Sequence, residues 1–297
     1  MKLQTITQSM RVPFLLLTFA CVFLGASIVV ANQLPINFPF LGLALIGALL
    51  AHISVNTLNE YFDFKSGLDL VTDKTPFSGG SGALPQNPEM LSVVFKVGVA
   101  SLLATLLIGS FFIWKHGIAI MPIGIAGLVL IWTYTGWVNK HPFICLFAPG
   151  FGFGFLMVVG TSFVLAGSFL PQSWLLVAAV PFFLVNNLLL LNQYPDIKAD
   201  ASVGRNHFPI AYGVERSSII YALFTIATFS IIIACIMIGL LPMLSLIALL
   251  PMPLALFSTY GAIKYGSTIG KHPQYLGSNV AVTILTIFLL GLSIILG

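Results

Sequence analysis

The sequence predicts an all-α, polytopic membrane protein with about nine transmembrane helices, and three observations support this class. First, 58% of the 297 residues are hydrophobic and only 7% are charged, whereas soluble domains carry about 25% charged residues. Second, the chain contains nine apolar runs of the length that a helix needs to cross a bilayer, about 20 residues. Third, the basic residues fall almost entirely in alternate connections between these runs, as in proteins with positively charged cytoplasmic loops.

In chain order, the apolar runs lie near residues 12–31, 37–58, 91–113, 117–135, 143–167, 172–191, 217–240, 241–262 and 277–296. The first run follows Lys2 and Arg11, as in a signal peptide. Its length of about 20 residues favours a retained transmembrane helix over the shorter core of a signal peptide. The fifth run contains Pro149, Gly150 and Gly154, which predict a kink or a close contact with another helix.

The basic residues predict the orientation of these helices. With the N-terminus in the cytoplasm, all of the 12 Lys and Arg residues except Lys115 lie on or near the cytoplasmic side. This is the positive-inside pattern, so we expect the C-terminus outside, in the cytoplasmic membrane of a bacterium or archaeon. The net charge of +4 is small. We expect residues 1–297 to form a single membrane-embedded domain. Its expected partner is the lipid bilayer, and no nucleic acid is expected.

Two acidic phrases at helix ends hold most of the negative charge. The first is NEYFDFKSGLDLVTD (59–73), the second is NQYPDIKAD (192–200), and together they contain six of the 8 acidic residues. Aligned without gaps, they share Asn59 with Asn192, Tyr61 with Tyr194, Asp63 with Asp196, and Lys65 with Lys198. Both phrases lie on the predicted cytoplasmic side, so we expect the function to lie where these helix ends meet.

The spacing within the phrases predicts oxygen ligands for a metal ion. Residues that are four positions apart lie on one face of a continued helix. This spacing occurs between Asn192, Asp196 and Asp200, between Asn59 and Asp63, and between Asp69 and Asp73. Carboxylates this close repel one another unless a cation lies between them. Hard oxygen ligands suit Mg²⁺, which commonly bridges to substrate phosphates, so the phrases predict a diphosphate site. The alternative is a set of solvated helix ends, which is the favoured interpretation for Glu60 taken alone.

In these motifs the chain resembles the UbiA-type membrane prenyltransferases, which attach isoprenyl groups to aromatic acceptors. The resemblance covers nearly the whole chain and rests on NEYFDFKSGLD (59–69), TPFSGGSGALP (75–85), YTGW (134–137) and NQYPDIKADASVGRNHFPIAYG (192–213). It implies nine helices around a central cavity with a cytoplasmic cap. It also implies that Mg²⁺ and a prenyl diphosphate bind at the acidic phrases, with metal ligands Asp63, Asp69, Asp73, Asp196 and Asp200.

The reaction implied by the resemblance is an electrophilic aromatic substitution in which diphosphate leaves as positive charge grows at C1 of the prenyl group. Mg²⁺ and basic side chains would stabilise the leaving group. The expected catalytic residues are Asp63, Asp196, Lys198 and Arg205. The expected substrate-binding residues are Asn59, Asn192, Tyr134, Lys140, Lys65 and Lys74, together with His52 and Asn56 from a polar stripe on the second helix. An interhelical hydrogen bond is the alternative role for His52, as for Asn186 and Asn187.

The acceptor is less clearly indicated than the reaction. The Asp-x5-Asp spacing of Asp63 and Asp69 resembles the branch that prenylates dihydroxynaphthoate for menaquinone. One departure counts against that branch, because Phe-Ile-Cys-Leu stands at 143–146 in place of Gly-Leu-Gly-Glu. The Tyr-x3-Lys pattern of the whole family is also altered, because Lys140 follows Tyr134 by six positions. Another quinone, haem, chlorophyll, another lipid acceptor or a terpenoid cyclisation on the same scaffold stays open.

Two other classes of membrane protein are disfavoured. A metal-lined transporter would carry its acids near the bilayer midplane, whereas these lie at helix ends on one side. A CDP-alcohol phosphotransferase would carry an Asp-Gly-x2-Ala-Arg signature, which the sequence lacks. The SGGSG run (78–82) lacks the Lys-Ser/Thr ending of a P-loop. We expect it to form a flexible part of the cap that closes over the site.

Overall fold

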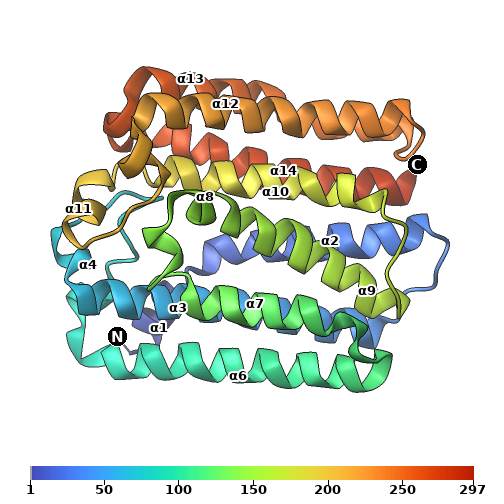
Figure 1. The fold of residues 1–297 in the computed structure, drawn as a ribbon, viewed down its shortest axis with the longest axis horizontal. Coiled ribbons are helices and arrows are strands. Elements are labelled where there is room, and N and C mark those ends of the chain that lie inside the picture. The colour runs from blue at the N-terminus through green and yellow to red at the C-terminus, as the bar shows by residue number, and fades with distance from the viewer. Residues whose placement is uncertain (1) are drawn as a thin grey trace.

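The computed structural model describes residues 2–297, which form helices and loops and contain no β-strand. The long helices lie side by side in one bundle (Figure 1). The α-helices are α1 (Lys2–Ser9), α2 (Leu16–Ala31), α3 (Phe38–Ser66), α4 (Leu68–Val71), α5 (Ala83–Gln86), α6 (Leu91–His116), α7 (Met121–Thr133), α8 (Pro142–Gly150), α9 (Gly160–Ala166), α10 (Trp174–Asn192), α11 (Ile197–Ser202), α12 (Phe208–Met237), α13 (Met252–Tyr265) and α14 (Pro273–Leu296). A π-helical segment (Phe151–Val159) joins α8 to α9.

Within residues 2–297, 8 helical segments are long and apolar enough to cross a membrane, and they match every expected run except the fourth. A shorter apolar helix, Ile118–Thr133, takes the place of the fourth run and contains α7. The two ends of the chain lie at opposite ends of the bundle (Figure 1), as an odd number of crossings requires. The predicted all-α polytopic membrane fold is confirmed, and the count of nine helices is approximate.

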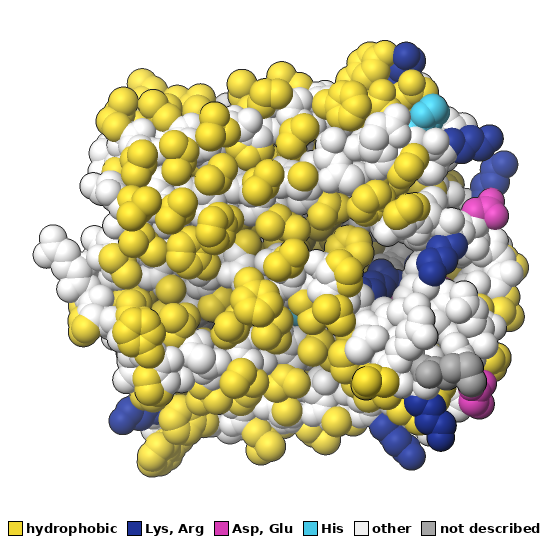
Figure 2. Space-filling model, turned by 180° about the vertical axis from the view of Figure 1, so that it is seen from behind, with side chains coloured by type: hydrophobic (Ala, Val, Ile, Leu, Met, Phe, Trp, Pro, Cys, Tyr) yellow, Lys and Arg dark blue, Asp and Glu magenta, His cyan; other side chains and the backbone are white. Residues whose placement is uncertain are grey.

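Charged side chains gather at one end of the bundle. Figure 2 shows Lys, Arg, Asp and Glu concentrated there, with a broad apolar surface over the rest of the visible face, as contact with lipid requires. The C-terminal end of α3, the short helices α4 and α11, and the N-terminal end of α12 meet at this end (Figure 1). We call it the acidic end, because both acidic phrases lie on these elements.

The first acidic phrase begins inside a helix that is longer than expected. α3 continues to Ser66, beyond the expected end near residue 58. Gly67 stops the helix by adopting a left-handed conformation with φ 83°, which is readily accessible only to a residue without a Cβ atom. Asn59 and Asp63 therefore lie about one turn apart on the same helix, as their spacing predicted.

The step from Asp69 to Asp73 is broken. α4 is a single turn that ends at Val71, so Asp69 lies within it and Asp73 lies in the loop that follows. Asp69 is partly buried, whereas Asp73 is exposed. The expectation that these two side chains share a helical face is therefore wrong.

The second acidic phrase does not form the continuous helix that its spacing predicted. α10 ends at Asn192, and α11 begins at Ile197. Pro195 lies between them, and proline interrupts a helix because it has no N–H to donate and its ring clashes with the preceding turn. The expectation that Asn192, Asp196 and Asp200 share one face of a continued helix is therefore wrong.

Two glycines let the end of α8 and the π-helical segment after it approach α10 closely. A Cβ atom on Gly150 would lie 2.1 Å from the carbonyl oxygen of Phe182, and one on Gly154 would lie 2.7 Å from that of Ala178. Asn186 of α10 adds to the contact, because its Oδ1 accepts a hydrogen bond from the N–H of Gly150 at 2.6 Å. The predicted close helix contact is confirmed, and Asn186 forms an interhelical hydrogen bond.

Gly150→Ala is expected to lower the free energy of unfolding by about 1–3 kcal/mol, because the added methyl group overlaps the α10 backbone. Gly42→Ala is the matched control, since a Cβ atom there would meet nothing within 4 Å. Both variants share the gain in helix propensity of about 1 kcal/mol, so their difference isolates the packing effect. Denaturant titration in micelles measures both variants, and equal stabilities would contradict the close contact.

Buried polar side chains link α10, α12 and α14 inside the apolar bundle. Tyr221 donates a hydrogen bond to Oδ1 of Asn279 at 2.9 Å, and Asn279 donates to the carbonyl of Asn187 at 3.2 Å. Asn187 in turn donates to Oγ1 of Thr225 at 3.0 Å. A polar group in an apolar interior is costly unless it is paired, so these bonds fix how the three helices pack. Asn187 therefore has the interhelical role that was the alternative to substrate binding.

Candidate active site

Arg205 joins the two acidic phrases. Its guanidinium lies between Asp63 on α3 and Asp200 on α11, hydrogen-bonded to Oδ1 of Asp200 at 2.8 Å and to Oδ1 of Asp63. The side chains of Asp63 and Asp200 are only 7% and 5% exposed, so two nearly buried carboxylates share the single positive charge of Arg205. The predicted meeting of the two helix ends is confirmed, with Arg205 as the link.

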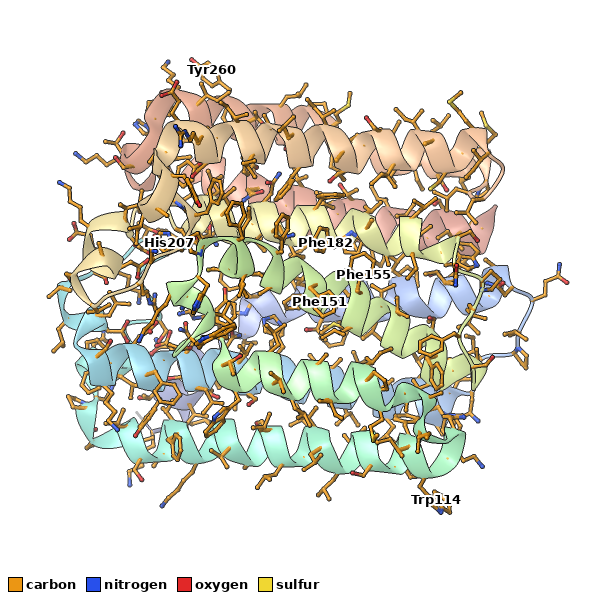
Figure 3. All side chains as sticks on the ribbon, viewed as in Figure 1. Trp114, Phe151, Phe155, Phe182, His207 and Tyr260 are labelled. Atoms are coloured by element: carbon orange, nitrogen blue, oxygen red, sulfur yellow. The ribbon has the colours of Figure 1, made fainter. Side chains whose placement is uncertain are left out.

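His207 completes this cluster and was not identified from the sequence. Its Nε2 lies 2.9 Å from Oδ2 of Asp200, and it lies beside α11 at the acidic end (Figure 3). Although burial opposes ionisation of Asp200, the hydrogen bond with His207 and the charge of Arg205 lower the pKa of this carboxyl below its usual range. Asp200 lies on α11 and His207 precedes α12, so the contact depends on the loop between the two helices, which no sequence pattern indicated.

Three buried side-chain oxygens at the acidic end accept no hydrogen bond from any residue in 2–297. They are Oδ2 of Asp69, Oδ1 of Asn192 and Oδ1 of Asp196. Burial, with the neighbouring charges of Glu60 and Asp63, raises the pKa of Asp69 to about 7. Burial and the nearby aspartate on α11 raise the pKa of Asp196 to about 7 as well. Buried acceptors without a partner are rare in native proteins, so these three oxygens are available to bind a ligand or water.

The chemistry of these oxygens fits a Mg²⁺ ion that is shared with a substrate. Mg²⁺ prefers oxygen ligands, keeps several waters, and is commonly bound through one or two carboxylates plus substrate phosphates. Within residues 2–297, no group of three or more His, Cys, Asp or Glu side chains forms a complete metal-binding set. Asp69, Asn192 and Asp196 therefore suit an ion whose coordination is completed by phosphate and water. Of the other expected ligands, Asp63 and Asp200 are engaged by Arg205.

Glu60 is fully buried and holds two other segments in place. Its Oε1 accepts hydrogen bonds from Nη2 of Arg11 and from the N–H of Ser81, both at 2.8 Å, and its Oε2 accepts one from the Ser81 hydroxyl at 2.6 Å. Because Glu60 is 0% exposed, the interpretation of this residue as a solvated helix end is wrong. Arg11 supplies the compensating charge. It lies 49 residues from Glu60 along the chain, so no local sequence pattern could predict the pair.

The loop after α4, residues 72–82, covers the acidic end, and we call it the cap loop. Gly79 and Gly80 adopt positive φ angles of 78° and 73°, which glycine accepts without strain. The N–H of Gly79 donates to Oδ2 of Asp196 at 3.0 Å. A Cβ atom on Gly80 would lie only 2.8 Å from Oδ1 of Asp69, so the loop backbone packs directly on the acidic side chains. The SGGSG run therefore belongs to the cap loop, and its flexibility and closure stay predictions.

A cavity of about 370 Å³ leads from the acidic end into the apolar interior of the bundle. Its polar lining comprises Arg11, His52, Asn56, Asn59, Tyr134 and Asn192, with Thr105 and Thr161, and its other lining residues are almost all apolar. Asn59 donates a hydrogen bond to Oγ1 of Thr135 at 3.2 Å. His52 shares a hydrogen bond of 2.8 Å with Thr18, so it has the interhelical bond and also faces the cavity.

Comparison with known proteins identifies the family of the chain. Residues 16–268 match the model of the UbiA prenyltransferase family. The chain belongs to this family. It is 28% identical over 173 residues to the 1,4-dihydroxy-2-naphthoate octaprenyltransferase of Bacillus subtilis (strain 168). That match covers 57% of this chain and 53% of the relative, so it spans about half the length of the relative.

Solved structures of UbiA homologues share the fold. One from Aeropyrum pernix K1 has a TM-score of 0.69 at 15% identity, and the match covers 91% of this chain and 94% of that chain. One from Archaeoglobus fulgidus, bound to DMAPP and Mg²⁺, has a TM-score of 0.62 at 16% identity, over 98% of this chain and 99% of that chain. At this level of identity the likeness shows the fold, and the roles of single residues depend on the geometry of this chain.

Five residues that the UbiA resemblance assigned to the site are exposed and do not line the cavity: Asp73, Lys65, Lys74, Lys140 and Lys198. Lys65 lies 5.6 Å from the ring centroid of Tyr61, and Lys74 donates to the carbonyl of Ser81 in the cap loop. Lys140 and Lys198 have no side-chain partner within residues 2–297. A positive-inside bias places lysines at this end whether or not they bind substrate, so the sequence could not separate the two groups.

Proposed function

We propose that this protein transfers an isoprenyl group from a prenyl diphosphate to an aromatic acceptor, with Mg²⁺, in the biosynthesis of menaquinone or another quinone. The observation that carries the proposal is a single cavity with two chemically different ends. Its inner part is apolar, as an isoprenyl chain requires. Its polar end includes Asn192, one of the three buried oxygens without a partner. A lipid diphosphate is the class of substrate that matches both ends.

The residues at the polar end would act on the diphosphate. Asp69, Asn192 and Asp196 would hold Mg²⁺, which when bound would neutralise charge on the leaving group. Arg11 lines the cavity, and a guanidinium can bind two phosphate oxygens with parallel donors. Arg205 links the two acidic phrases. This link would keep Asp69 of the first phrase and Asp196 of the second in fixed relative positions.

The chemistry is a substitution at C1 of the donor. The bond between C1 and the bridging oxygen breaks, and its electron pair leaves with the diphosphate. A carbon of the aromatic acceptor forms a bond to C1, and the ring then loses a proton. The apolar walls keep water from the cationic carbon. The positive charges of Arg11 and of a bound Mg²⁺ ion would stabilise the negative charge that develops on the diphosphate. The protein thus supplies position, dry surroundings and preorganised charge.

A dihydroxynaphthoate is the acceptor that the comparisons favour. The Bacillus subtilis relative is named for 1,4-dihydroxy-2-naphthoate, and the spacing of Asp63 and Asp69 resembles that branch. His52 and Asn56 line the cavity and offer polar groups for the ring hydroxyls. We also place the acidic end in the cytoplasm of a bacterial or archaeal cell, because the basic side chains gather there (Figure 2).

A transfer assay with purified protein in lipid vesicles tests the proposed function. The protein receives Mg²⁺ and radiolabelled farnesyl diphosphate, with dihydroxynaphthoate, hydroxybenzoate, homogentisate or no acceptor. We expect transfer to one aromatic acid, with dihydroxynaphthoate as the first candidate, loss of transfer in EDTA, and recovery when Mg²⁺ is restored. Unchanged transfer in EDTA would contradict the metal requirement, and no use of the donor with any acceptor would contradict the reaction.

A further inference from the structure

Cys145 is a buried thiol on α8 with a polar partner on each side. It belongs to the Phe-Ile-Cys-Leu stretch at 143–146 and is only 1% exposed. Gln193 donates a hydrogen bond from Nε2 to Sγ of Cys145 at 3.3 Å, and Sγ donates to Oδ1 of Asn139 at 3.4 Å. A thiol is a weak donor and also a weak acceptor, so both bonds can form at once. We call Gln193, Cys145 and Asn139 the thiol bridge.

One end of the thiol bridge holds the turn that carries two of the proposed metal ligands. Gln193 directly follows Asn192, the last residue of α10, and Asp196 comes three residues later. Pro195 interrupts the helix between them, so helical hydrogen bonds alone do not fix the turn at 193–196. Oδ1 of Asn192 and Oδ1 of Asp196 accept no hydrogen bond within residues 2–297. The positions of these oxygens therefore depend on what holds the turn.

Two consecutive side chains attach this turn to two different helices. Tyr194 is 0% exposed, and its hydroxyl shares a hydrogen bond of 3.1 Å with Oγ of Ser218 on α12. Gln193 bonds to Cys145 on α8. Loss of the thiol would therefore free the turn on the α8 side, while the contact of Tyr194 with α12 stays in place.

The other end of the thiol bridge reaches the loop that carries Arg205. Asn139 lies in the short 3-10 helix Val138–Lys140 and is 5% exposed. Its backbone carbonyl accepts a hydrogen bond from the N–H of Asn206 at 2.9 Å. Asn206 stands between Arg205 and His207, the two residues that hold Asp200. A continuous line of hydrogen bonds and covalent bonds therefore runs from the turn at 193–196 to the loop at 203–207.

We propose that Cys145 is a positioning residue, which fixes the turn at 193–196 relative to the loop at 203–207. This inference rests on the proposed function. Cys145 does not line the cavity, so it acts on Mg²⁺ and diphosphate only through the residues that it holds. Hydrogen bonds outside the ligands fix how the ligands face a metal, and their loss typically lowers metal affinity by about 10–100-fold. The thiol bridge supplies such bonds near Asp196 and, at its other end, near Arg205.

Cys145→Ala and Cys145→Ser test the role of the two hydrogen bonds. Alanine removes both bonds, whereas a serine hydroxyl donates and accepts as the thiol does. The probe is Mn²⁺ with inorganic diphosphate, and electron paramagnetic resonance measures the free ion in the presence of purified protein. We expect Cys145→Ala to weaken Mn²⁺ binding about tenfold, Cys145→Ser to recover most of this loss, and the Mg²⁺ concentration for half-maximal transfer to change in parallel. A serine variant as weak as the alanine variant would overturn the proposal.

Cys235 provides the matched control, because it is another buried cysteine with 1% exposure. It lies near the C-terminal end of α12 and has no hydrogen-bond partner within residues 2–297. Cys235→Ala removes the same volume without breaking a polar contact, so we expect its Mn²⁺ affinity to stay within about twofold of the wild type. Equal losses in the two alanine variants would mean that only packing is involved, and this would overturn the proposal.

Hydrogen exchange gives a readout that needs neither metal nor substrate. The N–H of Asn206 is bonded to the carbonyl of Asn139, and a bonded amide exchanges only when the structure opens locally. We expect the peptide that contains Asn206 to exchange severalfold faster in Cys145→Ala than in the wild type, and at the wild-type rate in Cys235→Ala. Unchanged exchange in Cys145→Ala would overturn the proposal, because the thiol would then not hold this loop.

The double variant Cys145→Ala with Gln193→Leu tests whether the two residues act as one unit. Gln193→Leu alone also removes the bond to the thiol, so we expect the double variant to bind Mn²⁺ about as weakly as Cys145→Ala. Losses that multiply to about a hundredfold would mean independent effects and would overturn the proposal. Failure of the proposed function is distinct, because the wild type would then transfer no isoprenyl group, whereas Mn²⁺ binding and hydrogen exchange would still test the role of Cys145.

Discussion

Asp196→Asn is expected to lower kcat for prenyl transfer by about 100-fold or more, because it removes a negative charge that would hold Mg²⁺, and the ion would stabilise the leaving group. Asparagine keeps the size of the side chain and an oxygen that can accept the hydrogen bond from Gly79. It loses the negative charge, and the Oδ1 that has no partner in the protein can be replaced by an amide nitrogen, which does not bind Mg²⁺. The initial rate measured against Mg²⁺ concentration checks the prediction, and we expect the variant to need more Mg²⁺ for half-maximal rate.

Asp73→Asn is the matched control, because it makes the same chemical change in the other acidic phrase. Asp73 is exposed, and its carboxyl has no hydrogen bond or ion pair within residues 2–297, so activity should stay within about twofold. Lys198→Ala provides a second comparison, since Lys198 lies two residues from Asp196 but is exposed. If either control were as damaging as Asp196→Asn, burial would be the wrong guide to the site.

The fold class was predictable because the bilayer imposes a simple rule on composition. A helix that crosses it needs a long apolar run, and such runs are visible without knowledge of packing. The boundaries were less predictable, because polar residues continue a helix where it leaves the apolar region. α3 keeps Asn59 and Asp63 within the helix, beyond the end that hydrophobicity suggested. Pro195 signals the break after α10, whereas the four-residue spacing of the acids indicates a continuous helix.

The candidate site was predictable where its chemistry is local and unpredictable where it depends on packing. Repeated acids mark both helix ends, and Arg205 does join them. The partner of Glu60 could not be found in this way, because Arg11 reaches it only when the segment before α2 packs against α3. The roles of the lysines could not be predicted for a different reason, since membrane orientation and phosphate binding select the same residue type at the same end.

Glu60→Gln is expected to lower the free energy of unfolding by about 3 kcal/mol and to raise KM for the prenyl diphosphate. The change removes one partner of a buried pair and leaves the Arg11 charge without compensation, which typically costs 3–5 kcal/mol. A value at the low end is expected, because the Arg11 side chain is 29% exposed. The Ser81 bonds that hold the cap loop weaken as well. Denaturant unfolding and the KM for the donor measure the two effects, and the exposed Glu89→Gln serves as the control.

The double variant Arg11→Met with Glu60→Gln separates the two roles of this pair. Replacing both members of a buried ion pair is often neutral for stability, because no uncompensated charge remains. We therefore expect stability to recover in the double variant, while KM for the donor stays high, because Arg11 no longer lines the cavity with a guanidinium. If KM recovered together with stability, the pair would have only a structural role. A high KM in a stable protein requires that Arg11 contact the diphosphate, with Glu60 as the residue that positions it.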